Sequence, residues 1–444
     1  MTGSVTGKSG DMDPRKLLLD SFHAAIVATD PLRIVPGHLP PRPPRGRTLV
    51  VGVGKAAAAM ALAVENHWPG NAILNGIVIT RYGHGLPLKR IKVIEAGHPV
   101  PDAQGEQATR DILAEVEKLG ADDLLLCLVS GGGSSLFSLP VAGVSIGDLQ
   151  NVTRELLLCG VPIHAINTVR KHLSAVQGGR LAASCHAPIL ALLVSDVTGD
   201  DPTHIASGPC APDPTTYSDA LGILEHYRIN TPVAVMKTLQ AGARGELDET
   251  PKPGDAVFRN VENRVIAKAH DALRAAAGYF RSQGIPAAIL GDSITGEARE
   301  VAKVLAALVK EIRQYGQPWK PPVALISGGE TTVTLRETEH NRNSGHRKQG
   351  GRNTEFLLSL AIELNGAPET HALACDTDGI DGTENNAGGI ATPDSLHRAT
   401  QVGMNAATLL TSHDAYHFFE ELGDLIITGP TRTNVNDYRV ILIL

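Results

Sequence analysis

Features that mark several other classes of protein are scarce or missing in this sequence of 444 residues. Its five cysteines are widely spaced and include no C-x-x-C pair, which argues against a disulfide framework and against a zinc site. It has no run of about 18 apolar residues, so we expect no membrane-spanning helix. Residues 1–13 are polar and lack the apolar stretch of a signal peptide, so we expect a disordered tail there and a cytoplasmic protein.

An excess of positive charge is also missing. The chain has 40 Lys and Arg against 47 Asp and Glu, a formal net charge of -7, and it contains no basic run. Proteins that bind nucleic acids usually concentrate Lys and Arg against the phosphates, so a nucleic-acid partner is not expected. Hydrophobic residues make up 42% and charged residues 20%, which is ordinary for a soluble globular protein and excludes a disordered or fibrous chain.

Glycine, by contrast, is abundant at 46 residues, and many glycines stand just after short apolar runs. Runs of this kind cover residues 48–51, 76–80, 124–129 and 189–194, and segments with helical patterns lie between them. Apolar runs without alternation are typical of strands buried on both faces, as in a parallel sheet. Strands that alternate with helices predict a doubly wound α/β domain, whose ligands bind at the carboxyl ends of the strands.

The pattern divides the chain into two predicted domains. A stretch rich in Gly and Pro at residues 246–256 is interpreted as a linker. Before it lies an N-terminal Rossmann-like domain of three αβα layers at residues 14–245, and after it a second α/β domain at residues 257–444. In the second domain we expect helices at 266–280, 296–315 and 353–364, strands at 286–290, 323–326 and 371–375, a hairpin strand at 331–335, and a surface loop at 340–351.

The turn after the first predicted strand contains Gly52, Gly54 and Lys55. With Ala57 it matches the relaxed dinucleotide fingerprint G-x-G-x-x-A, which alone is a weak signal. A lysine at the start of a helix opposes the helix dipole, so Lys55 fits best where an anion binds. The alternative is an exposed, solvated lysine.

Two further glycine turns follow predicted strands. Successive backbone N–H groups without side chains can converge on phosphate oxygens, and neither turn is a Walker A loop. A tight structural turn is the alternative for both. The residues predicted to bind phosphate are Ser130, Gly131, Gly132, Gly133, Ser134 and Ser135 in the first domain, and Gly328, Gly329 and Glu330 in the second.

Each domain also has a cluster of three carboxylates beyond a buried strand. Such groups can hold Mg²⁺, which needs only one or two protein carboxylates, or can act as the base that orients a hydroxyl group. Aspartate as a turn former or helix N-cap is the alternative. The six residues are Asp196, Asp200 and Asp201, and Asp376, Asp378 and Asp381.

Basic residues complete the set of candidates. Arg170, Lys171 and His172 are adjacent in a predicted helix, and Arg352 precedes Asn353 at the start of another. An arginine fork there could clamp a carboxylate or a phosphate. His172 alone is more often a structural histidine than a catalyst. No G-x-S-x-G elbow is present, which argues against acyl transfer.

Taken in order, these motifs resemble those of the class II glycerate kinases, the family with a C-terminal MOFRL domain. The matching blocks extend over nearly all of the chain after residue 13. They are found at residues 52–56, 97–102, 130–135, 166–174, 178–182, 195–200, 205–209, 327–331, 350–355, 376–382 and 428–437.

This resemblance implies transfer of the ATP γ-phosphate to the 2-hydroxyl of D-glycerate, giving 2-phosphoglycerate, with Mg²⁺. It implies two α/β domains with the active site in a cleft between them, the MOFRL region being about 322–437. Lys55 and Arg352 would be the catalytic cations, and Asp196 a base or a metal ligand. Substrate contacts would come from Arg170, Lys171, His172, Arg352 and Asn353, and metal contacts from Asp196, Asp376 and Asp378.

Some questions stay open at this level. The family pattern Gly-Pro-Thr-Asp-Ala-Ala-Gly is replaced here at residues 382–388, and Asn-Asp-Ser becomes His413-Asp414-Ala415. An NAD(P)H-dependent hydroxypyruvate reductase, with Arg81 on a 2′-phosphate, is the alternative enzyme, and a catalytically inactive binding protein is the alternative that is no enzyme. The oligomeric state is open, with a homodimer as one option.

Overall fold

The computed structural model describes residues 13–335 and 350–444. The chain forms two compact units that are not simply successive in the sequence. The N-terminal unit contains Thr29–Lys268 together with Arg432–Val435. The C-terminal unit contains the segment up to Ala28, Ala269–Thr431 and Asn436–Leu444. The two-domain α/β organisation expected from the sequence is confirmed.

The N-terminal unit is built on a six-stranded sheet with the order β3-β2-β1-β4-β5-β6, in which all neighbouring pairs are parallel. Because the strand order reverses between β1 and β4, the loops that follow these two strands diverge and leave room for a ligand. The strands are β1 (Thr48–Val53), β2 (Leu74–Arg81), β3 (Ile91–Ala96), β4 (Leu124–Val129), β5 (Ile189–Val194) and β6 (Val261–Ala267).

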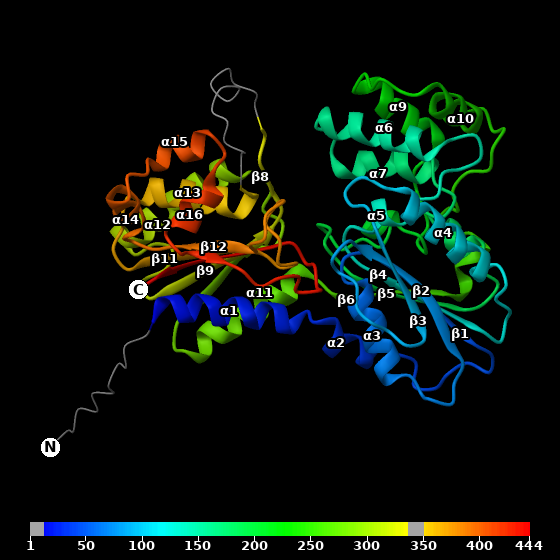
Figure 1. Ribbon diagram of the computed structural model, residues 1–444, viewed down its shortest axis with the longest axis horizontal. Helices are drawn as coiled ribbons and strands as arrows, with labels where there is room; N and C mark the ends of the chain where they lie inside the picture. The colour runs from blue at the N-terminus through cyan, green and yellow to red at the C-terminus, as the bar shows by residue number, and fades with distance from the viewer. Residues whose placement is uncertain (1–12, 336–349) are drawn as a thin grey trace. The chain divides into compact units, whose positions relative to one another are not determined.

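Helices cover both faces of this sheet, as expected for a Rossmann-like domain. Leu49, Val51 and Val53 of β1 pack in one core with α4 (Ala103–Val116), whereas Gly52 faces α3 (Ala57–His67) on the other side. A group of four further helices has a core of its own (Figure 1). They are α6 (Ile146–Leu158), α7 (Ile163–His172), α9 (Tyr217–His226) and α10 (Val233–Ala243).

Short helices connect these elements. They are α2 (Pro31–Ile34), η1 (Val35–His38), α5 (Gly133–Leu136), α8 (Arg180–Ala183), η2 (Ile205–Ser207) and η3 (Ala256–Asn260).

The C-terminal unit has a mixed sheet with the order β13-β12-β11-β14-β9-β7, in which only β7 and β9 are parallel. Two very short strands, β8 (Gly296–Glu297) and β10 (Thr331–Thr332), pair separately. The strands of the main sheet are β7 (Ala287–Gly291), β9 (Val323–Gly329), β11 (Thr370–Asp376), β12 (Gly388–Ala391), β13 (Leu425–Ile426) and β14 (Asp437–Ile443).

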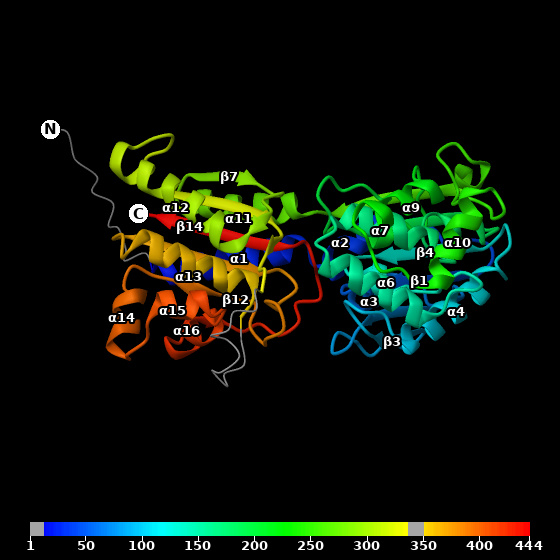
Figure 2. The same ribbon diagram turned by 90° about the horizontal axis from the view of Figure 1, so that it is seen from above.

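Helices α1 (Pro14–Ala28) and α11 (Ala269–Ser282) lie along one face of this mixed sheet (Figure 1). On the other face lie α12 (Ala298–Tyr315) and α13 (Arg352–Leu364). Three shorter helices gather beside α13 (Figure 2): α14 (Ser395–Gln401), α15 (Ala406–Thr411) and α16 (Ala415–Glu421).

The division between the units differs from the boundaries expected at residues 245 and 257. Strand β6 completes the N-terminal sheet, and α1 packs in the C-terminal unit. The stretch expected to be a linker, 246–256, is packed on the N-terminal unit, where buried Thr250 donates a hydrogen bond to Asp213 at 3.0 Å. Its Gly and Pro content indicates a break in secondary structure, which is not the same as a break between domains.

Several expected elements of the second half also differ. The helix expected at 266–280 is α11, since Ile266 and Ala267 still belong to β6. The hairpin strand expected at 331–335 is reduced to β10, which pairs in parallel with β8. Most of the loop expected at 340–351 lies outside the described residues, as does the tail expected at 1–13 except for Asp13.

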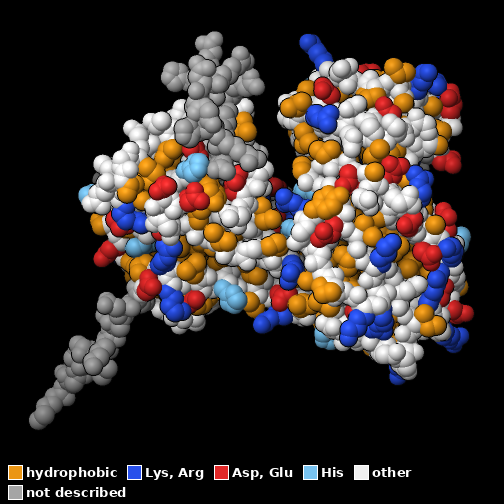
Figure 3. Space-filling view, viewed as in Figure 1, with side chains coloured by type: hydrophobic (Ala, Val, Ile, Leu, Met, Phe, Trp, Pro, Cys, Tyr) orange, Lys and Arg blue, Asp and Glu red, His pale blue; other side chains and the backbone are white. Residues whose placement is uncertain are grey.

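The distribution of charged side chains on the surface agrees with the small formal net charge of -7. On the face drawn in Figure 3, basic and acidic side chains are interspersed over each unit. In the described parts of the chain, no helix combines the length and the apolar character that crossing a membrane requires.

Candidate active site

In the N-terminal unit, the turn after β1 is hydrogen-bonded to the turn after β4. The backbone N–H of Lys55 donates to the carbonyl of Gly131 at 2.9 Å, and the N–H of Ala56 donates to the hydroxyl of Ser130 at 3.0 Å. Gly54 has a φ of 119°, and a Cβ added there would lie closer than 3.0 Å to Ser130. The two glycine turns therefore form one structure at the carboxyl edge of neighbouring strands, as the sequence predicted.

Asp196, just beyond β5, reaches the same structure. A Cβ added to Gly131 would overlap with the carboxylate of Asp196 and with the side-chain amide of Asn434, whose Nδ2 lies 3.4 Å from Oδ2 of Asp196. Glycine at 131 is thus required by the space that these two side chains fill. Sequence reasoning missed Asn434, although it stands in the matching block 428–437.

Lys55 lies over the second glycine turn. Gly132 has a φ of 80°, and a Cβ there would approach the ring of His98 to 2.9 Å and Cγ of Lys55 to 3.4 Å. The side chain of Lys55 therefore lies beside the loop predicted to hold phosphate. His98 is a second residue of this site that was not singled out, although it belongs to the matching block at 97–102.

A strained turn at Ala206 and Ser207 packs against the glycine turn at residues 130–135. Ala206 and Ser207 both have left-handed backbones, with φ of 49° and 59°, a conformation that costs a residue other than glycine about 1–3 kcal/mol. Ser207 donates a hydrogen bond to the hydroxyl of Ser134 at 2.9 Å, and Ala206 fills the space where Gly133 has no side chain. Such strain is often found at functional sites.

The three basic residues of α7 point to different places. Nζ of Lys171 forms a buried ion pair with Asp213 at 3.3 Å. Nδ1 of His172 lies 2.8 Å from the carbonyl of Thr168, and its Nε2 lies 3.3 Å from Glu249. Lys171 and His172, predicted to bind substrate, thus have partners inside the protein, because their side chains lie on the buried face of α7.

Burial lowers the pKa of both Lys171 and His172, while the neighbouring carboxylate of Asp213 acts in the opposite direction. Arg170, on another face of the helix, lines a narrow pocket beside Ser134 and Ser135. Of the three basic residues on α7, the structure places Arg170 where a ligand could reach it.

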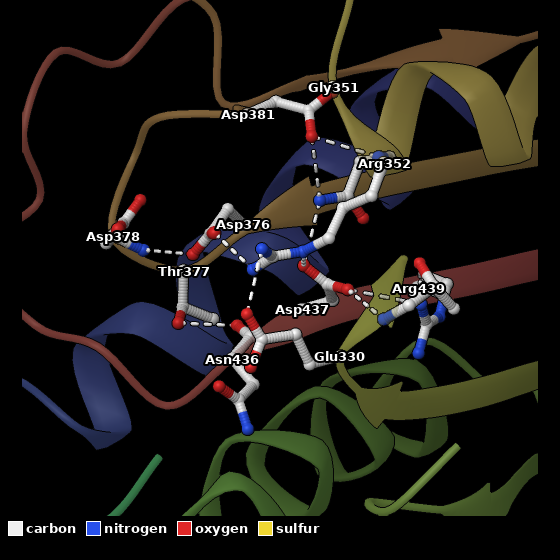
Figure 4. Close-up of polar contacts among 12 residues, drawn as sticks. Glu330, Gly351, Arg352, Asp376, Thr377, Asp378, Asp381, Asn436, Asp437 and Arg439 are labelled. Atoms are coloured by element: carbon white, nitrogen blue, oxygen red, sulfur yellow. Dashed lines mark hydrogen bonds and ion pairs between the residues drawn. The ribbon is translucent and has the colours of Figure 1, made fainter. Parts of the chain in front are cut away.

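In the C-terminal unit, Arg352 is the centre of a charged cluster (Figure 4). Its Nε lies 2.8 Å from Asp437, its Nη2 lies 2.7 Å from Asp376, and its Nη1 lies 3.0 Å from Glu330. Burial alone would lower the pKa of Arg352, but these three carboxylates together raise it well above its usual value. Arg352 begins α13, as predicted, and its charge is held by three acidic partners.

Asn353 and Asp381 organise the start of the same helix. The carboxylate of Asp381 accepts hydrogen bonds from the backbone N–H groups of Asn353 and Thr354, both at 2.9 Å. Burial raises the pKa of Asp381. Nδ2 of Asn353 donates to Asp437 at 2.9 Å, so this residue, predicted to contact substrate, is fully buried and positions Asp437.

The other predicted residues of this unit are placed differently from the expectation. Gly328 and Gly329 are the last residues of β9, paired with β14, and do not form a free glycine turn. Their N–H and C=O groups lie in a sheet because β14, far away in sequence, pairs with them. Glu330 follows as a carboxylate bound to Arg352 and is itself 54% exposed.

Asp376 and Asp378, predicted to bind a metal, are both buried. One oxygen of Asp376 accepts from Arg352 and the other from the backbone N–H of Asp378 at 3.0 Å, while Asp378 accepts from the N–H of Ile380 at 2.8 Å. Within residues 13–335 and 350–444, no three His, Cys, Asp or Glu side chains gather in a way that could hold a metal ion.

Comparison with known proteins places this geometry in a family. The sequence model of the MOFRL family matches residues 323–437, and that of a domain of unknown function, DUF4147, matches residues 17–240. A D-glycerate 2-kinase from Thermotoga maritima is 40% identical to this chain, over 97% of it and 98% of that protein. The chain belongs to the glycerate 2-kinase family.

A solved structure of glycerate kinase from Thermotoga maritima agrees, with a TM-score of 0.83 and 39% identity over 97% of this chain and 99% of that one. A protein from Agrobacterium vitis named putative hydroxypyruvate reductase is 47% identical over 98% of this chain and 95% of its own length. The family resemblance and the MOFRL region expected from the sequence are therefore confirmed. Both enzyme names occur among the relatives of this glycerate 2-kinase family member.

Proposed function

We propose that this protein transfers the γ-phosphoryl group of ATP to the 2-hydroxyl of D-glycerate, giving 2-phosphoglycerate and ADP. The observation that carries the proposal is the match to a D-glycerate 2-kinase over nearly the whole of both chains. Phosphoryl transfer requires the protein mainly to position the reactants and to neutralise charge on the transferred group. The described residues supply groups of both kinds.

The glycine turns of the N-terminal unit are the proposed place of the nucleotide phosphates. Residues 130–135 have small or no side chains, and Lys55 lies beside Gly132. Backbone N–H groups in such a turn suit phosphate oxygens, and a lysine there neutralises their charge. Gly54 belongs to this turn structure because its missing side chain lets the backbone after β1 lie against Ser130. Gly52 precedes it and lies against Val78 of β2 and Ala57 of α3.

Asp196 is the proposed acidic group that receives or orients the proton of the 2-hydroxyl. Asp196 follows β5, which is the neighbour of β4 in the sheet, so its carboxylate lies at the same sheet edge as the glycine turns. Its contact with Asn434 restricts its orientation. Kinetics at varied pH and Mg²⁺ concentration distinguishes a role as the base from a role as a metal ligand.

Arg352 is the proposed second cation of the reaction. Its guanidinium is preorganised by Asp376 and Asp437, which are almost completely buried. We propose that this cluster and the Lys55 site serve the same reaction. The cleft expected between the two domains stays a prediction, as do a cytoplasmic location and a homodimer.

Mg²⁺ is the proposed metal, carried with ATP. When bound, it neutralises charge on the β- and γ-phosphates. The donors fit, since Mg²⁺ prefers carboxylate oxygens and takes one or two of them. Asp196, Asp376 and Asp378 are the residues proposed to hold it, and each carboxylate oxygen of Asp376 can accept more than the one hydrogen bond named above.

A direct assay tests the proposed function. ADP release by the purified protein should depend on D-glycerate and stop when EDTA removes Mg²⁺. Phosphorus NMR of the product should show a doublet, because a 2-phosphate couples to one CH proton, whereas a 3-phosphate couples to two and gives a triplet. NAD(P)H consumption with hydroxypyruvate, without ADP release, would instead support the reductase.

A further inference from the structure

Arg170 carries a charge that no described acidic residue balances. Its only hydrogen bond within the described parts of the chain is a long one, 3.5 Å from Nη1 to the side-chain oxygen of Asn167. Burial lowers the pKa of Arg170 to about 10, and no carboxylate in the described parts of the chain offsets this effect. By solvent exposure Arg170 is partly buried. Charges withdrawn from water in proteins are normally paired, so an anionic ligand in the pocket would be a fitting counter-ion for Arg170.

The hydroxyl groups around Arg170 point to the same kind of ligand. Ser134 accepts a hydrogen bond from Ser207, and Ser174 accepts from the N–H groups of Val176 and Gln177. Neither hydroxyl donates its own hydrogen to any described residue. Ser174 is only 2% exposed, so solvent satisfies it poorly. Together with the guanidinium, these hydroxyls can donate hydrogen bonds to a ligand in the pocket, whose described lining contains no carboxylate.

The pocket that these donors share is small and otherwise neutral. Among the residues that the structure describes, Arg170 is the one positively charged residue of the pocket lining, and none of the lining side chains is acidic. A group that only accepts hydrogen bonds and carries a single negative charge fits this lining, whereas a triphosphate would require more positive charge. The lining residues are Pro101, Ser134, Ser135, Ser138, Leu149, Thr153, Arg170, Ser174 and Gln177.

The surroundings hold Arg170 in place. Its neighbour Lys171 anchors the end of α7 through the buried ion pair with Asp213. Arg180 donates to the carbonyl of Ser174 and, at 3.0 Å, to the hydroxyl of Tyr217, which fixes the segment that follows α7. A preorganised site loses less freedom when it binds its ligand.

We propose that this pocket binds the carboxylate of the hydroxy-acid substrate, and that Arg170 with Ser134 and Ser174 selects an acid over a neutral alcohol. The proposal rests on the proposed kinase function and assigns one end of its substrate. Ser134 also belongs to the glycine turn proposed for phosphate. The acid and the phosphates would therefore be held by opposite sides of the same short segment.

The experiment compares Arg170→Met, Arg170→Lys and Ser174→Ala with Arg154→Met, a control on the exposed side of α6. Arg170→Met should raise KM for D-glycerate about 10- to 100-fold, the effect of losing hydrogen bonds to a charged group. KM for ATP should stay within about twofold, since the proposed ATP contacts are elsewhere. Arg170→Lys should recover part of the loss, and Ser174→Ala should show a smaller increase.

Selectivity gives an independent readout. The wild type should prefer D-glycerate strongly over glycerol, and Arg170→Met should lose most of that preference. If KM for ATP rises while KM for D-glycerate stays normal, the pocket binds phosphate and the proposal is wrong. It is equally wrong if neither constant changes in a folded variant. If Arg170→Met does not fold, the KM values of Arg170→Lys and Ser174→Ala for D-glycerate and for ATP test the proposal in the same way.

Binding without turnover separates this proposal from the function on which it rests. Calorimetric titration of the wild type with D-glycerate should give heat of binding, and Arg170→Met should not. If the protein shows this binding but releases no ADP, the kinase function fails and the carboxylate pocket stands. If the protein releases ADP with D-glycerate and Arg170→Met binds and turns over normally, only the pocket assignment fails.

Discussion

Nη1 of Arg352 lies 3.0 Å from Oε1 of Glu330. Of the three carboxylates that contact this guanidinium, Glu330 is the exposed one. Glu330 is 54% exposed, whereas Asp376 and Asp437 are 3% and 0% exposed. An incoming phosphate can therefore replace Glu330 more easily than either aspartate. The role of Glu330 in nucleotide binding stays a prediction, and the alternative is that its negative charge competes with phosphate for Arg352.

Glu330→Gln should therefore lower KM for ATP, by about two- to fivefold, because losing an exposed ion pair frees Arg352 at small cost. Steady-state kinetics at varied ATP measures this, with Glu300→Gln as a control. Glu300 also forms an exposed ion pair, with Lys303 at 2.8 Å on α12. A higher KM for ATP in Glu330→Gln would show that Glu330 assists binding, for example through Mg²⁺.

Lys55→Ala should lower kcat by about 10³-fold or more, since a cation that stabilises the transferred phosphoryl group contributes on this scale. Arg352→Ala is expected to have a similar effect, and Arg352→Lys serves as a version that keeps a positive charge beside Asp376 and Asp437. Lys118→Ala is the control, because Lys118 is exposed and pairs with Glu115 at the surface. A nearly normal kcat in either variant would remove that residue from the mechanism.

Gly131→Ala should lower kcat about tenfold or more. The new methyl group would occupy space now filled by Asp196 and Asn434, so the carboxylate must move; misplacement of about 1 Å can reduce rates about 10²-fold. Gly147→Ala is the matched control, because a Cβ there meets only Ser145 at 3.7 Å and Gly147 lies in helix α6. Unchanged kinetics in a folded Gly131→Ala would contradict the role of Asp196.

Stability should fall as the pH decreases below about 6.5. Burial lowers the pKa of His172 in the folded protein, although its bond to Thr168 and the charges of Asp213 and Glu249 act in the opposite direction. The folded state therefore binds fewer protons than the unfolded state between the lowered pKa and about 6.5, so unfolding is favoured as the pH falls through this window.

Thermal unfolding midpoints measured from pH 5 to pH 7.5 check this prediction. His172→Gln, which cannot take up a proton, should show a flatter dependence on pH, whatever its own midpoint is. His226→Gln, at an exposed position of α9, should keep the slope of the wild type. Equal slopes for the wild type and His172→Gln would show that other groups cause the dependence.

Much of this architecture follows from local sequence patterns. Uninterrupted apolar runs predicted β4 and β5 with the bounds that the structure shows. The glycines after β1 and β4 predicted the turns that meet at one sheet edge. These predictions succeed because strand burial and turn conformation depend on residues close together in the chain. The order of the matching sequence motifs also indicated the family, because it combines many such local segments into one pattern.

Other features depend on segments that are far apart in the sequence. Arg352 is surrounded by carboxylates from β11 and β14, and Gly328 lies in a strand because β14 pairs with it. Local sequence also could not show that Lys171 is buried beside Asp213, while Arg170, its neighbour, has no acidic partner among the described residues. Composition and periodicity determined which segments form strands, helices and turns, whereas the partner of each charge was decided only when folding brought remote segments together.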